Sequence, residues 1–233
     1  SSADQAALDG AKMVIWTTTP WTIPANRAIA FSPRFSYGLY QANDEKLVLS
    51  DTLAEQVMRA AKIEDFTRLG DVTELDLIVC KHPFAGQGYD YDVPVLAGDF
   101  VTDETGTGLV HIAPGHGQDD FELGLKHNIE VPFTVDEAGV YYDHVPLFAG
   151  RCVYDQKGKD GDANGGVIGA LIEANGLLAK GKLRHQYPHS WRSKAPLICR
   201  NTPQWFISMS QGDLRDKALK AIDEVQWYPK AGR

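Results

Sequence analysis

Hydrophobic and polar positions change their spacing repeatedly along this chain. Short runs of β-branched, aromatic and aliphatic residues, bounded by Gly, Pro, Asn or Asp, predict strands because such runs fit a half-buried pleated surface. The strands expected on this basis cover residues 13–17, 27–31, 37–41, 46–49, 75–80, 93–97 and 109–112.

Other segments carry apolar residues at the three- and four-residue spacing of a helix. Residues 52–62 are an example, and Thr52 with Glu55 resembles a capping box at the start of this segment. Further helices are expected over residues 118–127, over residues 166–175, where Gly176 would end the helix, and over residues 213–224.

Strands outnumber helices in this pattern, and strand and helix do not alternate regularly, which disfavours a doubly wound parallel sheet. We expect an α+β fold in which a β-barrel-like core is surrounded by short helices. Residues 1–180 would form this core, and residues 181–233 would form a basic C-terminal segment packed on the same domain. Residues 157–166 are rich in Gly and Asp, which is typical of a mobile loop.

Composition narrows the setting in which the chain works. Its 233 residues are 43% hydrophobic and 23% charged, as in a globular protein, and no apolar run approaches the roughly 18 residues of a membrane helix. The three cysteines lie far apart and form no Cys-x-x-Cys pair for zinc, which favours a reducing cytoplasm. Because the first residue is not Met, we expect a part of a longer polypeptide.

The charge is uneven along the chain. A net charge of −8 argues against a protein that binds nucleic acid over its whole surface, because phosphate binding needs many Lys and Arg residues. Residues 174–212 nevertheless contain no Asp or Glu, and their positive side chains are Lys180, Lys182, Arg184, Arg192, Lys194 and Arg200. This stretch is either a local contact for an anionic partner or a solvated basic face.

The first segment with unusual chemistry covers residues 16–26 and reads Trp-Thr-Thr-Thr-Pro-Trp-Thr-Ile-Pro-Ala-Asn. An expected strand ends here in three consecutive hydroxyls, and Pro20 and Pro24 then force the chain out of regular structure. Hydroxyls in this position can line a pocket. A β-branched strand end followed by a turn is the structural alternative.

The second segment covers residues 106–121, in which an expected strand leads into a Gly-rich loop that opens a helix. His111 alternates with apolar neighbours and should point to one side of the sheet, while Asp119 and Asp120 lie near the helix start. A hydrogen-bonded core histidine and a pair of helix-capping aspartates would explain the same residues without a site.

These two segments carry a resemblance. Thr-Thr-Thr-Pro-Trp-Thr-x-Pro-Ala-Asn and Gly-Thr-Gly-x-Val-His-x-Ala-Pro-Gly-His-Gly-x-Asp-Asp resemble, in order, the signatures of the isoleucyl-tRNA synthetase editing domain, a connective polypeptide of a class I synthetase. Residues 187–192 and 202–206 resemble the return path into the synthetic core. The related valine and leucine enzymes typically have Thr-Thr-Arg-Pro before an acidic residue, so Thr19-Pro20-Trp21 favours the isoleucine type.

The resemblance implies post-transfer proofreading by an aminoacyl-tRNA deacylase. Isoleucine exceeds valine by one methylene, which is worth only about 1–3 kcal/mol in a pocket, and this synthetase is the standard example of that limit. The synthetic site therefore attaches some valine to the tRNA, and a second site must hydrolyse the resulting valyl-tRNA(Ile). Valyl-adenylate is a further substrate that this second site could hydrolyse. The implied partners are the acceptor end of tRNA(Ile) carrying valine and the remainder of the isoleucine–tRNA ligase, with no membrane. ATP and magnesium would belong to the missing synthetic core, and this part would need no cofactor or metal.

The same resemblance implies roles for the catalytic group. Asp120 would bind the ammonium group of the aminoacyl ester through a charge-assisted hydrogen bond. A threonine hydroxyl is too weak an acid to lose its proton near neutral pH, so it cannot act as a general base. Thr17 and Thr18 would therefore hold the ester or the attacking water. His111 would shape the side-chain pocket together with Thr19, although a general-base role for His111 remains an alternative.

The remaining candidates would contact other parts of the substrate. Trp16 would stack on the terminal adenosine, and Asn26 would hold ribose or loop backbone, with a core Trp and a turn Asn as the structural alternatives. His116 would touch the substrate or cap its turn, and Asp119 is a further substrate-binding candidate.

Three other functions fit part of the pattern. A passive module would hold the tRNA acceptor end through the basic stretch without catalysis. A metallohydrolase would use His111, His116 and Asp120, although no zinc-ligand spacing is present. A free-standing editing factor is the third alternative, and the return-path motifs argue for an insertion in a larger enzyme.

Overall fold

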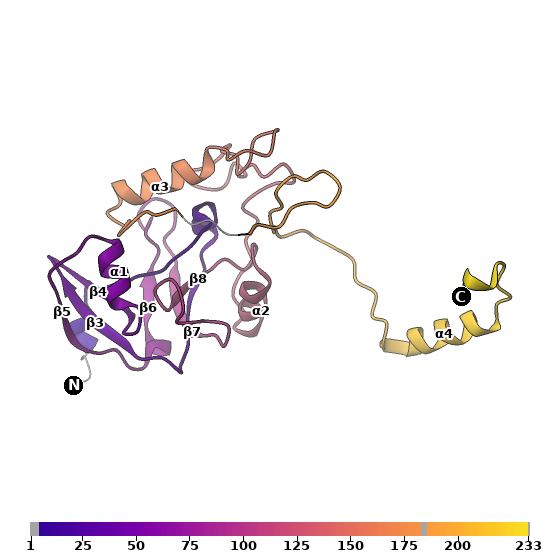
Figure 1. Ribbon diagram of the computed structural model, residues 1–233, viewed down its shortest axis with the longest axis horizontal. Coiled ribbons are helices and arrows are strands. Elements are labelled where there is room, and N and C mark those ends of the chain that lie inside the picture. Colours follow the sequence, from indigo (N-terminus) through magenta and orange to yellow (C-terminus); the bar gives the residue numbers. More distant parts are fainter. Residues whose placement is uncertain (1–4, 183–185, 233) are drawn as a thin grey trace. The chain divides into compact units, whose positions relative to one another are not determined.

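The computed structural model describes residues 5–182 and 186–232, and their strands assemble into two four-stranded sheets (Figure 1). The first sheet has the order β1-β4-β3-β5, and the second has the order β6-β7-β2-β8. The bounds are β1 (Lys12–Met13), β2 (Ala28–Phe31), β3 (Tyr37–Ala42), β4 (Glu45–Ser50), β5 (Phe66–Asp71), β6 (Val79–Lys81), β7 (Asp92–Ala97) and β8 (Leu109–Ile112).

The first sheet is built around a local hairpin. Strands β3 and β4 pair antiparallel from Tyr37 opposite Ser50 to Ala42 opposite Glu45. Asn43 in the two-residue connection has φ 52°, a left-handed conformation that asparagine adopts more readily than most residues. The short strand β1 then adds to β4 in parallel, which requires the chain to return from a distant element.

The second sheet positions the segment that carries His111. Its central strand β2 is buried throughout and pairs parallel with β7 and antiparallel with β8. The register places His111 directly opposite Ile29. Because β8 is held along its length by β2, the direction of the His111 side chain is set by the sheet.

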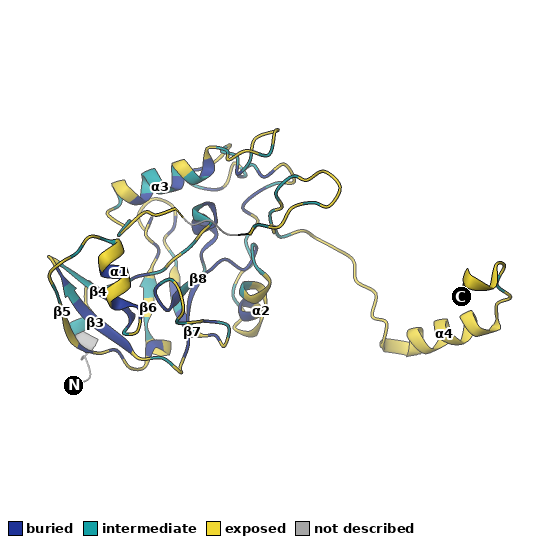
Figure 2. Cartoon of the chain, viewed as in Figure 1, coloured by how far each residue is buried: buried dark blue, intermediate teal, exposed yellow. Residues whose placement is uncertain are grey.

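The two sheets share one apolar core. Ile29 and Val95 from the second sheet and Leu39 and Val48 from the first belong to the same buried cluster. Further clusters lie beneath the helices α1 (Ala54–Ala60) and α3 (Ala163–Glu173), and Figure 2 shows buried residues concentrated along the strands. Burial of apolar surface between these layers is the main stabilising contribution to the fold.

Short helices complete the unit around the sheets. Helix α2 (Gln118–Lys126) follows β8 after a loop, and 3-10 turns occur at η1 (Gln5–Leu8), η2 (Pro20–Ala25) and η3 (Leu75–Leu77). The turn η2 packs against α3, where the Trp21 backbone N–H donates to Asn164 Oδ1 at 3.0 Å. The chain around the two prolines is therefore held in place.

The expected α+β class with short surrounding helices is confirmed. The strands do not close into a barrel in the part of the chain that is described, and they form two open sheets instead. The edge strands β1 and β6 have two and three residues, so they offer few backbone groups for a closing ladder.

Three local expectations were wrong in detail. The strand expected over residues 13–17 stops at Met13, and Trp16 forms only an isolated bridge with Val110. The run over residues 75–80 is divided between η3 and β6. Helix α1 begins after Leu53 without a side-chain cap, so Thr52 and Glu55 form no capping box.

The contacts divide the chain into two units, residues 1–201 and 202–233. The second contains η4 (Gln211–Asp213), α4 (Leu214–Glu224) and η5 (Lys230–Gly232), and none of its described residues is buried (Figure 2). The expectation that residues 181–233 pack on the same domain as residues 1–180 stays a prediction. No helix in the described ranges is long and apolar enough to cross a membrane.

Candidate functional site

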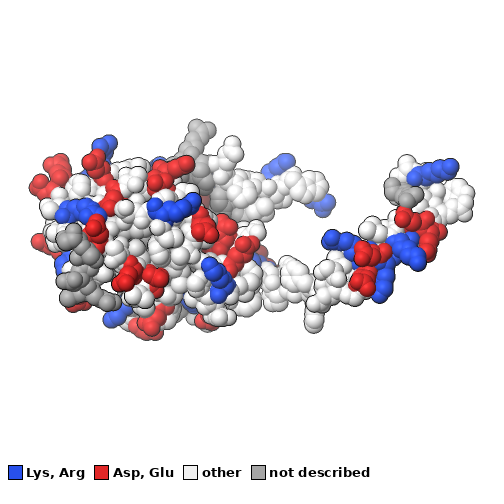
Figure 3. Space-filling view, turned by 90° about the horizontal axis from the view of Figure 1, so that it is seen from below, with Lys and Arg blue, Asp and Glu red and all other residues white. Residues whose placement is uncertain are grey.

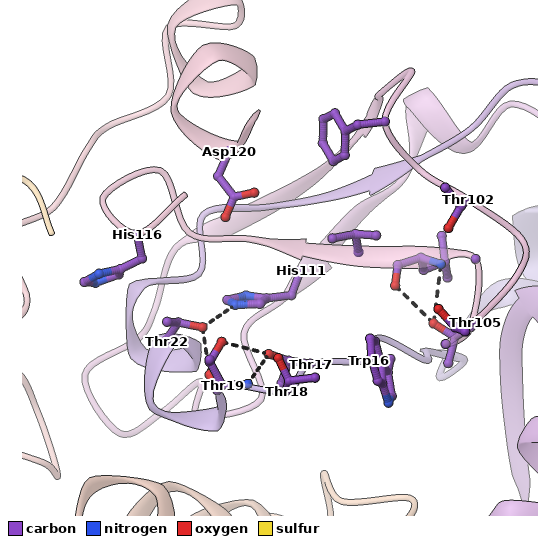
Figure 4. A pocket seen from close by; sticks show the side chains of 16 residues that line it. Trp16, Thr17, Thr18, Thr19, Thr22, Thr102, Thr105, His111, His116 and Asp120 are labelled. Carbon is purple, nitrogen blue, oxygen red and sulfur yellow. Dashed lines mark hydrogen bonds between the residues drawn. The ribbon is translucent and has the colours of Figure 1, made fainter. Parts of the chain in front are cut away.

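The two unusual sequence segments meet at one cavity. Trp16 and Val110 form a parallel β-bridge, which brings the threonine triplet alongside β8. The cavity has a volume of about 280 Å³ and opens between these segments (Figure 4). The expected site residues that line it are Trp16, Thr17, Thr18, Thr19, His111, His116 and Asp120.

One wall of the cavity is made of threonine hydroxyls. Thr17 Oγ1 accepts a hydrogen bond from the Thr19 backbone N–H at 3.0 Å and lies 3.3 Å from Thr19 Oγ1. Pro20 then starts η2, where a missing N–H costs nothing because the first helical N–H groups have no intrahelical partner. The backbone turn therefore holds Thr17 and Thr19 together, while Thr18 is exposed.

His111 is buried behind this wall and has both ring nitrogens engaged. Asn26 Nδ2, which can only donate, lies 3.0 Å from His111 Nδ1. The proton of the neutral ring must therefore be on Nε2, which donates to Thr22 Oγ1 at 2.8 Å. Burial, with smaller contributions from His116 and His82, lowers the pKa of His111 to about 3, so the ring is neutral near pH 7.

The Thr22 hydroxyl links His111 to the threonine triplet by hydrogen bonds. Having accepted from His111, it donates its own proton to the Thr19 carbonyl oxygen at 2.9 Å. The Thr22 backbone N–H donates to the same oxygen, also at 2.9 Å. The chain Asn26–His111–Thr22–Thr19 is therefore a directed series of hydrogen bonds, part of which Figure 4 shows.

Asp120 brings a carboxylate to the opposite side of the cavity. It lies in the first turn of α2, and its Oδ2 accepts a hydrogen bond from the Ala113 backbone N–H at 3.1 Å. A Cβ at Gly117 would lie 3.0 Å from the carboxylate, so glycine there gives Asp120 its space. Burial raises the pKa of Asp120 to about 6, Ala113 opposes the rise, and Asp119 adds to it.

His116 connects the loop before α2 to more distant segments. Its Nδ1–H donates to the Cys199 carbonyl oxygen at 2.8 Å, and its Nε2 lies 2.5 Å from Thr134 Oγ1. Its ring also forms a T-shaped contact with the Trp21 ring, with centroids 4.8 Å apart. Burial lowers the pKa of His116. His116 thus lines the cavity and also fixes the shape of its loop.

Trp16 lies at an exposed margin of the cavity. Its side chain remains 44% exposed, and its ring packs against Gly106, where a Cβ would lie 3.3 Å from Trp16 Cε3. An exposed aromatic face beside a polar cavity is suited to stacking with a planar ligand group.

Two expected residues do not reach the cavity. Asp119 is exposed and absent from the lining, because consecutive helical residues point about 100° apart and Asp120 already faces inward. Asn26 is buried behind His111, and its Nδ2 also donates to the Ala28 carbonyl oxygen at 2.9 Å. Asn26 therefore contacts the backbone of β2 and the His111 ring, and its expected contact with ribose or loop backbone stays a prediction.

Sequence reasoning missed several residues of the lining. Thr22 belongs to the first unusual segment, but its link to His111 depends on the fold of η2. Thr102, Thr105 and Thr107 add further hydroxyls, which the threonine-rich composition of that stretch already signalled. Apolar side chains also line the cavity, namely those of Phe100, Leu109 and Val110.

Two observations concern the metallohydrolase and the passive tRNA-binding module. The described residues contain no group of three or more His, Cys, Asp or Glu side chains able to hold a metal ion, although His111, His116 and Asp120 line one cavity. On the face shown in Figure 3, acidic and basic side chains are interspersed and no continuous basic surface is visible. Arg184 of the basic stretch lies outside the described residues.

Comparisons with known proteins identify the family of the chain. A family model described as "Leucyl-tRNA synthetase, editing domain" matches residues 6–157. The isoleucine–tRNA ligase of Bradyrhizobium diazoefficiens is 47% identical over 100% of this chain and 26% of its own length. Those of Rhodopseudomonas palustris and Caulobacter vibrioides are each 47% identical over 98% and 96% of this chain.

The chain spans about a quarter of the length of these curated relatives. A solved structure described as the crystal structure of GlLeuRS-CP1 resembles 76% of this chain and 87% of its own, with a TM-score of 0.53. Its sequence identity of 17% limits that likeness to the fold. The resemblance carried by the two signature segments is confirmed, and the chain belongs to the family of editing domains of the leucyl-tRNA synthetase type.

Proposed function

We propose that this chain is the proofreading domain of an isoleucine–tRNA ligase and hydrolyses the ester bond of valyl-tRNA(Ile). The supporting observation is a single cavity that combines a threonine wall, a buried neutral histidine and an inward-facing carboxylate. The similarity of the whole chain to isoleucine–tRNA ligases supports the identity of the tRNA.

Asp120 would recognise the group that every aminoacyl ester shares. The α-ammonium group of the substrate carries a positive charge, and a carboxylate in a partly dry cavity makes a short, strong hydrogen bond to such a donor. Burial leaves the negative charge of Asp120 poorly solvated, which raises its pKa. The positive charge of an incoming ammonium group would stabilise the Asp120 carboxylate, and this interaction would raise the affinity for the substrate.

Thr19 and His111 would set the size of the side-chain pocket. Isoleucine exceeds valine by one methylene, and exclusion by steric clash works only when the wall does not yield. The bonds from His111 to Thr22 and from Thr22 to Thr19 hold this wall in one arrangement. A rigid wall can therefore reject a methylene that a flexible wall would accommodate.

The chemical step is attack of water on the ester carbonyl carbon. The ester C–O bond breaks, one proton of the water goes to the ribose oxygen of the terminal adenosine, and the other goes to solvent as valine leaves as its carboxylate. Thr17 and Thr18 would orient the water or the ester through their hydroxyls, so the rate gain comes from positioning and electrostatics. His111 does not fit the general-base role, because both ring nitrogens are engaged and its pKa is about 3.

Trp16 would hold the end of the tRNA by stacking on the terminal base, which aromatic side chains do without sequence preference. The remaining partner would be the rest of the synthetase polypeptide, consistent with the share of the relatives that this chain covers. Valyl-adenylate would offer the same ammonium and carbonyl groups and is the second proposed substrate.

The test replaces Asp120 with Ala in the chain as it exists. Deacylation of valyl-tRNA(Ile) should fall by at least about 100-fold, a typical loss for one important electrostatic contact, while tRNA binding is retained. Asp119→Ala is the matched variant, because that neighbouring carboxylate is exposed outside the cavity, and it should keep activity. A passive tRNA-binding module would bind tRNA without any deacylation by the wild-type chain, and unchanged deacylation by Asp120→Ala would remove the assignment.

A further inference from the structure

A second layer of side chains lies behind the cavity, centred on Arg27. Arg27 Nη1 donates to the Asn26 carbonyl oxygen at 2.8 Å and to the Tyr91 hydroxyl at 2.6 Å. The Tyr91 hydroxyl donates in turn to the same Asn26 oxygen at 2.9 Å. The guanidinium carbon also lies 4.2 Å from the centre of the Tyr91 ring, so the cation rests on the aromatic face. Neither residue lines the cavity.

These contacts leave Asn26 little freedom to move. Its backbone N–H donates to the Ile23 carbonyl oxygen at 2.9 Å, and its carbonyl oxygen accepts from Arg27 and Tyr91. Its side-chain Nδ2 donates to the Ala28 carbonyl oxygen and to His111 Nδ1. The backbone and the side chain of this buried residue are thus held by separate partners.

The position of Asn26 decides which nitrogen of His111 carries the proton. While Nδ2 of Asn26 faces Nδ1, the ring must keep its proton on Nε2 and donate to Thr22. If Asn26 moved away, the other tautomer would become accessible, and the Thr22 hydroxyl would then have to donate to His111. The Thr19 carbonyl oxygen would lose the side-chain bond from Thr22.

We propose that Arg27, seated on Tyr91, is a positioning residue of the editing cavity, which holds Asn26 in place and thereby keeps His111 in one tautomer and one orientation. This inference deepens the proposed function and rests on it for the kinetic part of its test. Arg27 acts on the substrate only through Asn26, His111 and Thr22.

Arginine is suited to this position for a geometric reason. One guanidinium nitrogen reaches two oxygens, on Asn26 and Tyr91, while the guanidinium carbon lies 4.2 Å from the centre of the Tyr91 ring. A lysine ammonium offers a compact charge on a flexible stem and does not reproduce this fixed arrangement of N–H donors beside the ring. The nearest acidic partner, Glu130, lies 4.0 Å from Arg27 Nε and is largely exposed, so an ion pair contributes little to holding Arg27.

The experiment compares Arg27→Lys and Tyr91→Phe with the wild-type chain. Histidine is labelled with ¹⁵N, and the signals of His111 are assigned from the spectrum of His111→Gln. Wild type should show Nδ1 unprotonated and Nε2 protonated, and both variants should show exchange between tautomers. In valyl-tRNA(Ile) deacylation, Arg27→Lys should lower kcat by about 10- to 100-fold with KM unchanged, the size of loss that follows a small displacement of positioned groups.

Arg68→Lys is the matched control. Arg68 is another arginine of the same unit, paired with Asp51 and Asp71 in the first sheet, and it does not line the cavity. This control should lose some stability while keeping both the His111 signals and kcat, which separates a positioning effect from a general loss of folding.

The possible outcomes separate the two proposals. Altered His111 signals with a lower kcat support the positioning role, and unaltered signals in both variants overturn it. If the wild-type chain does not deacylate valyl-tRNA(Ile), the proposed function fails, while the NMR comparison still decides whether Arg27 controls the tautomer. A fall in kcat of equal size in Arg68→Lys would also overturn the positioning role.

Discussion

Replacing Asp120 with Asn should make this protein more stable while removing the proposed deacylase activity. Asn has the same shape as Asp, and its Oδ1 can still accept the hydrogen bond from the Ala113 backbone N–H. The substitution removes the negative charge alone. Because the inward-facing carboxylate is partly cut off from water, the folded protein bears an electrostatic cost that the variant does not have.

The size and the pH dependence of this effect follow from the pKa of Asp120. A rise from 3.8 to about 6 corresponds to about 3 kcal/mol, at 1.36 kcal/mol for each pH unit. The folded state holds the proton more tightly than the unfolded chain, so the stability that protonated Asp120 contributes is fully present below about pH 4 and lost by about pH 6. The Asn variant should therefore exceed wild type by about 2–3 kcal/mol at pH 7.5 and match it at pH 4.

Equilibrium urea unfolding at both pH values measures this difference, with the fluorescence of buried Trp21 as one reporter of the core. Deacylation by the variant should be lost at every pH. In wild type, kcat/KM should fall as the pH drops through about 6, because a protonated Asp120 no longer attracts the ammonium group. A variant no more stable than wild type at pH 7.5, or one equally stabilised at pH 4, would refute the reasoning.

Four further results are expected. Gly108→Ala should lower the free energy of unfolding by about 2 kcal/mol or more, because φ is 77° and the new Cβ would lie 2.4 Å from Ser50 Cβ. Ser50→Ala should leave it unchanged or raise it by up to about 1 kcal/mol in the same urea assay, because that buried hydroxyl has no hydrogen-bond partner among the described residues. Trp16→Ala should raise KM for valyl-tRNA(Ile) about tenfold at unchanged kcat, as expected for loss of one stacking contact worth about 1–3 kcal/mol. Exhaustive chelation should leave deacylation unchanged, whereas a loss restored by zinc would favour the metallohydrolase alternative.

Local sequence patterns predicted the helices and strands in which the apolar residues are the buried residues. The strands β2, β3, β4, β7 and β8 and the helices α1 and α2 lie within a few residues of the expected ranges, because apolar spacing and turn residues act over short distances. The edge strand β5 was missed. Five of its six residues are not buried, so no alternation of apolar and polar residues marks it.

Long-range pairing was outside the reach of these patterns. Two of the strand pairs, β1 with β4 and β2 with β7, are parallel and join segments that are distant in the sequence. The division of the strands into two open sheets depends on such pairings. A local run of residues predicts that a strand exists, and its partner is decided by the packing of the whole unit.

In the candidate site, too, some properties follow from the sequence and others only from the tertiary structure. The order of residues in this chain determined which side chains carry chemistry, namely the threonine triplet, the histidine loop and the aspartate at the start of α2, because residue type and local spacing are enough to identify them. Only the tertiary structure decided that Asp120 faces inward while Asp119 faces solvent, that His111 is neutral between Asn26 and Thr22, and that Arg27 and Tyr91 support them from behind. Burial and hydrogen bonding between distant segments set these properties, and neither is a property of a short stretch of sequence.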